Sequence, residues 1–233
     1  MKVPVKHLLD GTFSVSSTKK VQFTKANLYW DGSAYHFEDN QTDYPTDPWD
    51  PNHVGNFYWT NLTDYQSGNA NYMPYAQSYS CSSRSTSDKF FCGEDNPLTV
   101  DGTSGCFALS NDEWYYLISS RANASNLCKC GVSVGGKANC LIIAPDGFSS
   151  TLKSSYTLDE VSSLGLVCLP AAGRRRGSSF GSAESWGGYW SSTPNSSDSY
   201  NAYYLLFYSD NVGTYGYDSR DYGRSLRLVR LAQ

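Results

Sequence analysis

The sequence predicts an α+β protein in which a few short helices accompany many short antiparallel strands. Three observations carry this prediction. Apolar and polar residues alternate over short stretches at both ends of the chain, which indicates strands. Two Ser/Thr-x-x-Glu motifs predict the starts of helices, and residues typical of turns separate these segments. No internal repeat or linker is evident, and 233 residues are enough to bury a substantial core. We therefore expect one domain over residues 1–233.

Composition excludes several partners. Charged residues make up 17% of the chain, and the formal net charge of −4 gives no basic footprint for nucleic acid. The longest apolar run, Cys140–Ala144, is far too short to cross a membrane, and residues 1–10 lack the apolar core of a secretion signal. We expect no nucleic acid partner and no membrane insertion. The one basic run, Arg174–Arg176, is expected on a solvated or ion-paired face.

The first elements are strands. Alternation over Thr12–Ser17 and Lys20–Trp30 predicts an opening antiparallel pair. The segment 38–105 that follows has no sustained period and is dominated by Asn, Asp, Ser, Gly, Pro and Tyr. Aromatic residues such as Phe57, Tyr58 and Trp59 punctuate it, which favours a long ordered loop insertion held by its rings over a flexible linker.

Two main helices are expected in the middle of the chain. Ser110 and Glu113 can form a capping box, and an apolar face follows, so we predict a helix near Asn111–Arg121. Thr157 and Glu160 repeat the motif ahead of a helix near Leu158–Leu164, with Gly165 as its C-terminal stop. Short apolar runs closed by proline predict strands at Cys140–Ala144 and Leu166–Leu169.

The C-terminal segment predicts two further strands. Over 203–208, alternation sends Tyr203, Leu205 and Phe207 to one face, which we expect in the core. Tyr204, Leu206 and Tyr208 would share the other, exposed face. In the last strand Leu226 and Leu228 alternate with Arg227, so one face of that strand is expected to be buried. We expect Arg227 and Arg230 to be structural, pairing with carboxylates or backbone carbonyls.

The stretch between these strands has the composition of a binding surface. Residues 210–222 are rich in Gly, Tyr, Asp and Ser, and Val212 is their only aliphatic side chain. Antibody binding loops have a similar composition, because Tyr gives large contact area at low entropic cost. From Ser191 to Tyr222 there is also no Lys, Glu, Gln, Met or Trp, the residues that no NNC codon encodes. This absence fits codons of the AAC or AAT type randomised at their adenines.

Several motifs resemble one protein family. Gly187-Gly-Tyr-Trp-Ser-Ser-Thr193, Ala202-Tyr203 and Gly223-Arg-Ser-Leu-Arg-Leu-Val-Arg230 resemble the variable region of proteins diversified by diversity-generating retroelements. Upstream, Lys20–Leu28, Leu109–Trp114 and Leu169–Gly173 resemble the same family. The resemblance implies a C-type-lectin-like fold related to formylglycine-generating enzymes, with residues 187–230 as the variable ligand-binding region. It also implies an unknown macromolecular partner, a protein or glycan on a cell surface, and a place on a virion or at the cell surface.

Two sets of positions follow from this resemblance. The scaffold would comprise Tyr189, Trp190, Ser191, Ser192, Thr193, Ala202, Tyr203, Leu205, Phe207, Val212, Arg220 and Gly223. The diversified, ligand-binding positions would be Ser197, Asp198, Ser199, Tyr200, Tyr204, Leu206, Tyr208, Asn211, Gly213, Thr214, Tyr215, Gly216, Tyr217, Ser219, Asp221 and Tyr222. The predicted phase of the strand over 203–208 agrees with this division.

No catalytic residue, metal ligand set or cofactor is predicted. None of the three histidines lies in a nucleophile motif, and the last cysteine, Cys168, precedes the region where an oxidase of the formylglycine type needs a reactive pair. The seven cysteines are expected mostly as buried or free thiols, with one or two loop disulfides as the alternative. An acidic loop with Asp43, Asp47, Asp50 and Asn52 is expected to be solvated rather than to hold an ion.

Three alternatives stay open. The chain could be a carbohydrate-binding lectin, although the familiar tripeptides Glu-Pro-Asn and Gln-Pro-Asp do not occur. It could be a structural phage or pilus subunit, which would not need a strand face so rich in binding-type residues. Finally, the Tyr-rich face of the 203–208 strand could pack against the insertion 38–105 instead of facing a ligand.

Overall fold

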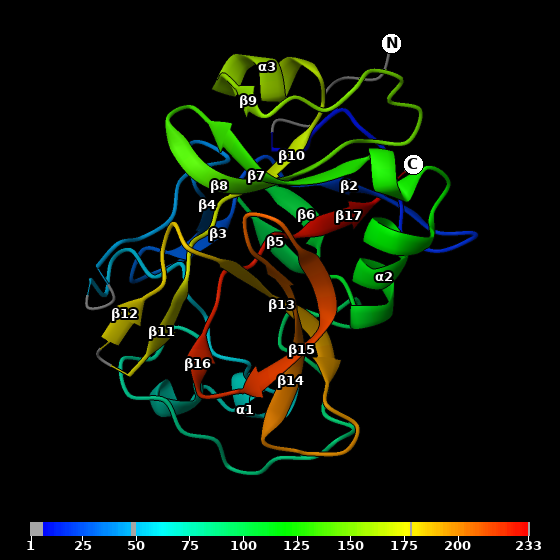
Figure 1. The fold of residues 1–233 in the computed structure, drawn as a ribbon. Coiled ribbons are helices and arrows are strands. Elements are labelled where there is room, and N and C mark those ends of the chain that lie inside the picture. The colour runs from blue at the N-terminus through cyan, green and yellow to red at the C-terminus, as the bar shows by residue number, and fades with distance from the viewer. Residues whose placement is uncertain (1–6, 48–49, 178, 233) are drawn as a thin grey trace.

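The structure is a computed structural model, and it describes residues 7–47, 50–177 and 179–232 (Figure 1). Residues 1–6, part of the stretch considered above for a secretion signal, lie outside the described residues. Many short strands form several small sheets, nearly all antiparallel, and a few short helices accompany them, so the α+β class is confirmed.

The two ends of the described chain meet in one sheet. Its strands are β1 (Phe13–Ser14), β2 (Lys20–Phe23) and β17 (Val229–Leu231), in the order β1-β2-β17 and all antiparallel. The predicted opening pair is confirmed, but it is shorter than expected. After β2 the chain forms a separate hairpin of β3 (Leu28–Trp30) and β4 (Tyr35–Phe37).

The central helices begin where the capping boxes predict. In α2 (Asn111–Tyr115) the Ser110 hydroxyl accepts from the Glu113 N–H at 3.2 Å, and the Glu113 carboxylate accepts from the Ser110 N–H at 2.7 Å. The helix continues as a π-helical turn, η2 (Tyr116–Ser120), so the predicted span is right but its last turn is wider. In α3 (Leu158–Ser163) Thr157 and Glu160 form the same box, and Gly165 follows with a φ of 64°.

A four-stranded sheet packs beneath α3 (Figure 1). It comprises β7 (Cys128–Val134), β8 (Lys137–Ile143), β9 (Ser155–Tyr156) and β10 (Val167–Leu169), in the order β10-β8-β7-β9. Both strands predicted here are confirmed as β8 and β10. The contact between β7 and β9 is parallel. The short 3₁₀ helix η3 (Ala124–Asn126) leads into β7.

The segment 38–105 is ordered around its aromatic rings. It holds α1 (Leu62–Gln66), the 3₁₀ helix η1 (Ala70–Tyr72), β5 (Leu98–Val100) and the start of β6 (Thr103–Cys106). Most of its buried rings belong to one apolar cluster with residues of the C-terminal region. From the segment this cluster takes Phe57, Trp59, Phe90 and Phe91, and from the C-terminal region Trp190, Ala202, Tyr204, Leu226 and Leu228. The segment therefore forms core contacts, as well as loops.

The C-terminal region forms two sheets. The first is β13 (Gly187–Pro194), β14 (Asn201–Phe207) and β15 (Val212–Ser219), with β14 in the middle. The second is β12 (Ser179–Gly181), β11 (Arg174–Arg176) and β16 (Tyr222–Gly223), with β11 in the middle. Within the basic run, Arg175 is buried over the ring of Tyr58, which corrects the expectation of a solvated or ion-paired face for that residue.

The strand β14 is buried on both faces. Leu205 and Phe207 pack with Trp114 and Leu117 of the helix that begins at Asn111. Ala202 and Tyr204 pack on the opposite side, in the cluster shared with the segment 38–105. The alternation is confirmed for Tyr204, Leu205 and Phe207. On the second face Tyr204 is covered by protein, as in the alternative that this face packs against the insertion, whereas Leu206 is half-buried and Tyr208 is exposed.

The last strand, β17, begins only at Val229, so residues 226–228 lie just ahead of it, and Arg227 departs from the expected alternation. Leu226 and Leu228 are fully buried as predicted, yet Arg227 is buried as well. Its guanidinium donates to the side chains of Asn27 and Gln41 and to the backbone carbonyls of Gln41 and Cys168. The predicted structural role of Arg227 is confirmed, and its acceptors are neutral oxygens.

Candidate binding surface

The predicted ligand-binding positions lie in β14, β15, the start of β16 and the loops between β13 and β16, and they differ in exposure. Eight are exposed: Ser197, Asp198, Tyr200, Tyr208, Asn211, Tyr215, Tyr217 and Asp221. Six are half-buried: Ser199, Leu206, Gly213, Gly216, Ser219 and Tyr222. Two are buried, Tyr204 and Thr214. The exposed set is concentrated in β15 and the loops, and β14 itself contributes little to it.

Tyr204 is a core residue, and its expected exposure was wrong. Only 8% of the residue is exposed, because the Arg224 guanidinium lies over its ring with Cζ 3.6 Å from the centroid. The Trp190 ring packs edge-on against it at 5.9 Å. On the neighbouring strand, Gly216 leaves the space that the Tyr204 ring needs, since a Cβ there would lie 3.0 Å from Tyr204 Cζ.

A β-bulge in β15 explains the burial of Thr214. Tyr204 pairs with Gly216, and Leu206 pairs with Gly213, so three steps along β15 oppose two steps along β14. One extra residue in a strand breaks the alternation of its side chains. Thr214 therefore turns inward, where only 1% of it is exposed and its Oγ1 has no hydrogen-bond partner among the described residues.

Past the bulge, β15 presents two tyrosines outward. Tyr215 is 75% exposed and Tyr217 is 56% exposed. The Tyr217 ring packs edge-on against Tyr203 at 6.2 Å, directly across the strand pair. The Tyr215 ring lies 5.8 Å from that of Tyr115 in α2, and the Tyr115 hydroxyl raises the pKa of Tyr215. The exposed rings therefore line the edge of the sheet beside α2.

Two residues of this patch were not among the predicted binding positions. Tyr203 was placed in the core by the strand phase, but it is half-buried against Tyr217. Tyr115 is 41% exposed and follows Trp114, whose side chain fills the core. The sequence already assigns Trp114, Leu117 and Ile118 to the apolar face of this helix. An aromatic residue outside that face is expected to be exposed, so the exposure of Tyr115 could have been predicted from the sequence.

The loop after β15 is fixed by arginines. Arg220 is buried, donates to Asp88 at 2.6 Å and to the Ser85 carbonyl at 2.9 Å, and its Cζ lies 4.2 Å from the Trp59 ring centroid. Arg84 pairs with Asp221 and lies over the ring of Tyr200. These contacts tie loop 82–88 of the insertion to the C-terminal region.

Most of the predicted scaffold positions are buried. Tyr189, Trp190, Ser191, Ala202, Leu205, Phe207, Arg220 and Gly223 are buried, while Ser192, Thr193, Tyr203 and Val212 are half-buried. Tyr189 donates its hydroxyl to the Pro170 carbonyl at 3.0 Å, and the Trp190 indole donates to the Phe57 carbonyl at 2.8 Å. The sheet behind the exposed tyrosines is therefore fixed by packing and by hydrogen bonds.

A second group of aromatic and charged side chains borders β16. Asp218 pairs with both Arg174 and Arg224. The Cζ of Arg174 lies 4.7 Å from the Tyr222 centroid, and that of Arg176 lies 5.2 Å from it. Tyr222 is thus near two guanidinium groups.

The described residues form no metal-binding cluster, and their cysteines are free thiols. Among the described residues, no group of three His, Cys, Asp or Glu side chains lies close enough to hold a metal ion. In the acidic loop, Asp43 accepts from the Asn40 backbone and side chain, and Asp50 accepts from the Asn52 N–H. All seven cysteines are free thiols, in agreement with the prediction, and burial raises the pKa of Cys106 to about 11.

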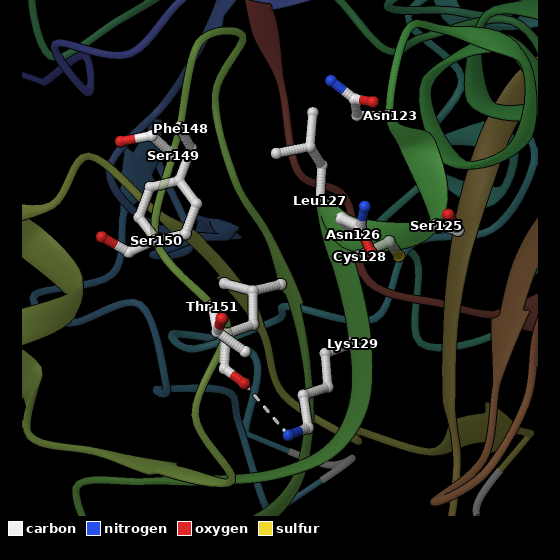
Figure 2. Close-up of a pocket in the computed structure, with 11 residues that line it drawn as sticks. Asn123, Ser125, Asn126, Leu127, Cys128, Lys129, Phe148, Ser149, Ser150 and Thr151 are labelled. Carbon is white, nitrogen blue, oxygen red and sulfur yellow. Dashed lines mark hydrogen bonds between the residues drawn. The ribbon is translucent and has the colours of Figure 1, made fainter.

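One pocket lies at the start of β7, apart from the predicted surface. It has a volume of about 580 Å³ and runs between Leu127–Lys129 and the loop 148–152, where Lys129 Nζ donates to the Leu152 carbonyl at 3.1 Å (Figure 2). A second pocket, of about 790 Å³, does include predicted residues, namely Ser219, Asp221 and Tyr222.

Comparison of the chain with protein-family models, with curated proteins and with solved structures gave no match. In the part of the chain that the structure describes, every helix is too short or too polar to cross a lipid bilayer.

Proposed function

We propose that this chain is a ligand-binding protein that recognises a macromolecule, a protein or glycan on a cell surface, through tyrosines displayed by β15 and by the loops that precede β14 and β15. One observation carries the proposal. Five of the seven large apolar side chains that are exposed in the described chain are tyrosines, and four of these, Tyr200, Tyr208, Tyr215 and Tyr217, lie within 18 residues of sequence. Tyrosine is enriched where interfaces derive their binding energy, because its ring buries large area and its hydroxyl stays hydrogen-bonded.

We further propose that the scaffold is C-type-lectin-like and that its C-terminal region is diversified by a retroelement. Burial supports this, since eight of the twelve scaffold positions are buried, whereas only two of the sixteen binding positions, Tyr204 and Thr214, are buried. A protein that tolerates many replacements at some positions needs its stability to reside at others. The buried Tyr189, Trp190, Leu205 and Phe207 provide such a core beneath the exposed residues. A virion or a cell surface is the expected place of action.

The diversification is tested by sequencing the 3′ end of the gene in many isolates. Differences should fall at adenines and change the exposed binding positions, while codons for the scaffold positions and for the buried Tyr204 and Thr214 stay constant. A reverse transcriptase gene and a near-copy of the 3′ segment should lie nearby. Differences scattered evenly over the two sets would contradict the proposal.

The binding role is tested on arrays of cell-surface proteins and glycans. The double variant Tyr215→Ser/Tyr217→Ser should lose its signal on any array component that the unaltered chain binds. Leu164→Ser is a matched control, because Leu164 is 41% exposed but lies at the end of α3. Equal signals for the unaltered chain and the double variant would exclude the tyrosine surface as the binding site.

A further inference from the structure

The second pocket lies between the insertion and the C-terminal region. One wall comes from Gln77, Ser78 and Tyr79, and the other from Arg176, Ser219 and Tyr222. Its two walls are far apart in sequence, so the pocket exists only because loop 219–222 returns to the insertion. It adjoins the proposed binding surface through Asp221, which is exposed.

Arg176 is the available cation in this part of the molecule. Its guanidinium has no carboxylate partner among the described residues and contacts the Tyr222 ring. Four nearby arginines are instead paired with carboxylates: Arg84 with Asp221, Arg174 and Arg224 with Asp218, and Arg220 with Asp88. Arg176 is exposed, so a group entering the pocket can reach it.

The remaining polar groups of the pocket are mainly hydrogen-bond donors. The Ser219 oxygen accepts from the Asp221 N–H at 3.3 Å, which leaves the hydroxyl proton free to donate. The side-chain amide N and O of Gln77 are buried with no hydrogen-bond partner among the described residues. The side chain can therefore rotate toward the pocket without breaking a hydrogen bond, and its N–H groups could then donate to a ligand. Asp221 is the one acidic group, and Arg84 already pairs with it. A donor-rich site favours an acceptor-only ligand group.

We infer that this pocket binds a carboxylate, the acidic side chain of a protein partner. A guanidinium donates two parallel hydrogen bonds to a carboxylate, and Arg176 is held for this by the Tyr222 ring. The inference rests on the proposed function for the nature of the partner. The inference adds one specific contact, between Arg176 and a carboxylate of the partner, next to the tyrosine surface.

The test uses the peptide acetyl-Glu-Glu-Glu-Glu-amide, titrated into ¹⁵N-labelled protein and followed by NMR. Amide signals of Gly177, Ser219 and Asp221 should shift, whereas acetyl-Gln-Gln-Gln-Gln-amide should leave them unchanged. Arg176→Gln should weaken the affinity by about tenfold or more, because a charge-assisted hydrogen-bond pair is lost. Lys153→Gln removes an exposed cation at a distance, beside Glu160, and should leave the affinity unchanged. Because Arg176 is exposed, its variant should unfold at the same denaturant concentration as the unaltered chain.

Three outcomes would overturn the inference. They are the absence of shifts with the glutamate peptide, an equal loss of affinity for Arg176→Gln and Lys153→Gln, and Arg176-dependent binding of trigalacturonate without binding of the peptide. The last would assign the carboxylate to an acidic sugar. If the Tyr215→Ser/Tyr217→Ser variant loses array binding while the peptide causes no shifts, the proposed function stands and the pocket inference alone fails.

Discussion

The Arg224 guanidinium lies on the ring of Tyr204, with 3.6 Å between Cζ and the ring centroid. The Trp186 and Trp190 rings lie 5.2 and 5.1 Å from the same Cζ, and Asp218 accepts from Nη2. Nε and Nη1 of Arg224 have no hydrogen-bond acceptor among the described residues. The charge is therefore stabilised largely by cation–π contacts with the rings of Tyr204, Trp186 and Trp190. Desolvation lowers the pKa of Arg224. This cluster places Tyr204 inside the fold.

Replacing Tyr204 should therefore destabilise the protein. We expect Tyr204→Ala to lower the free energy of unfolding by about 3 kcal/mol, because it leaves a cavity and uncovers Arg224. Tyr204→Phe keeps the ring and should cost about 1 kcal/mol or less. Urea denaturation followed by tryptophan fluorescence measures both. A loss below about 0.5 kcal/mol for Tyr204→Ala would show that the ring is not a core element.

The exposed tyrosines should behave in the opposite way. Tyr215→Ala and Tyr217→Ala should each change the free energy of unfolding by no more than about 0.5 kcal/mol, since both rings are mostly in solvent. Phe207→Ala, in the core beneath them, should cost about 3–5 kcal/mol. The same denaturation experiment compares the three variants. Similar losses for all three would mean that the outer face of β15 is also part of the core.

Arg220 should be required for the order of loop 82–88. We expect Arg220→Met to cost about 3–5 kcal/mol, because it leaves the half-buried carboxylate of Asp88 without its partner. Limited proteolysis should then cut first within 82–88. The variant Lys89→Met, which removes an exposed ion pair with Asp95, is the control and should keep the unaltered cleavage pattern. Identical patterns for both variants would refute the anchoring role.

The stability of the hairpin β3–β4 should depend on pH through His36. The Asp101 carboxylate, by its hydrogen bond, raises the pKa of His36 above 6.5. The folded state therefore holds this proton more tightly than the unfolded state, so the stabilisation is complete below pH 6.5 and is lost as pH rises through the raised pKa. Denaturation from pH 5.5 to 8.5 should show a decline that His36→Asn diminishes. An unchanged slope in that variant would exclude His36 as the source.

Local signals predicted the elements well. Both helices begin at their capping boxes, because the Ser/Thr side chain and the Glu three residues later satisfy backbone groups of the same turn. The alternation over β14 correctly separated Leu205 and Phe207 from Tyr204. The outward display of Tyr215 and Tyr217 also followed from composition, since a stretch almost without aliphatic residues cannot form a core.

Local sequence patterns did not predict which other segments pack against each face of a strand. The sequence placed Tyr204 and Tyr203 on opposite faces of a strand and left open whether the insertion 38–105 covers the face of Tyr204. It could not decide this, and it gave no sign that Arg224 covers the ring. Nor could it show the single-residue bulge that turns Thr214 inward, or the neutral acceptors that allow Arg227 to be buried. By itself the sequence determined caps, strand phase and the tyrosine-rich edge, because these depend on residues a few positions apart. The tertiary structure alone decided which faces are buried, because that depends on contacts between different segments, from neighbouring strands such as β14 and β15 to the insertion and the C-terminal region, which are far apart in the sequence.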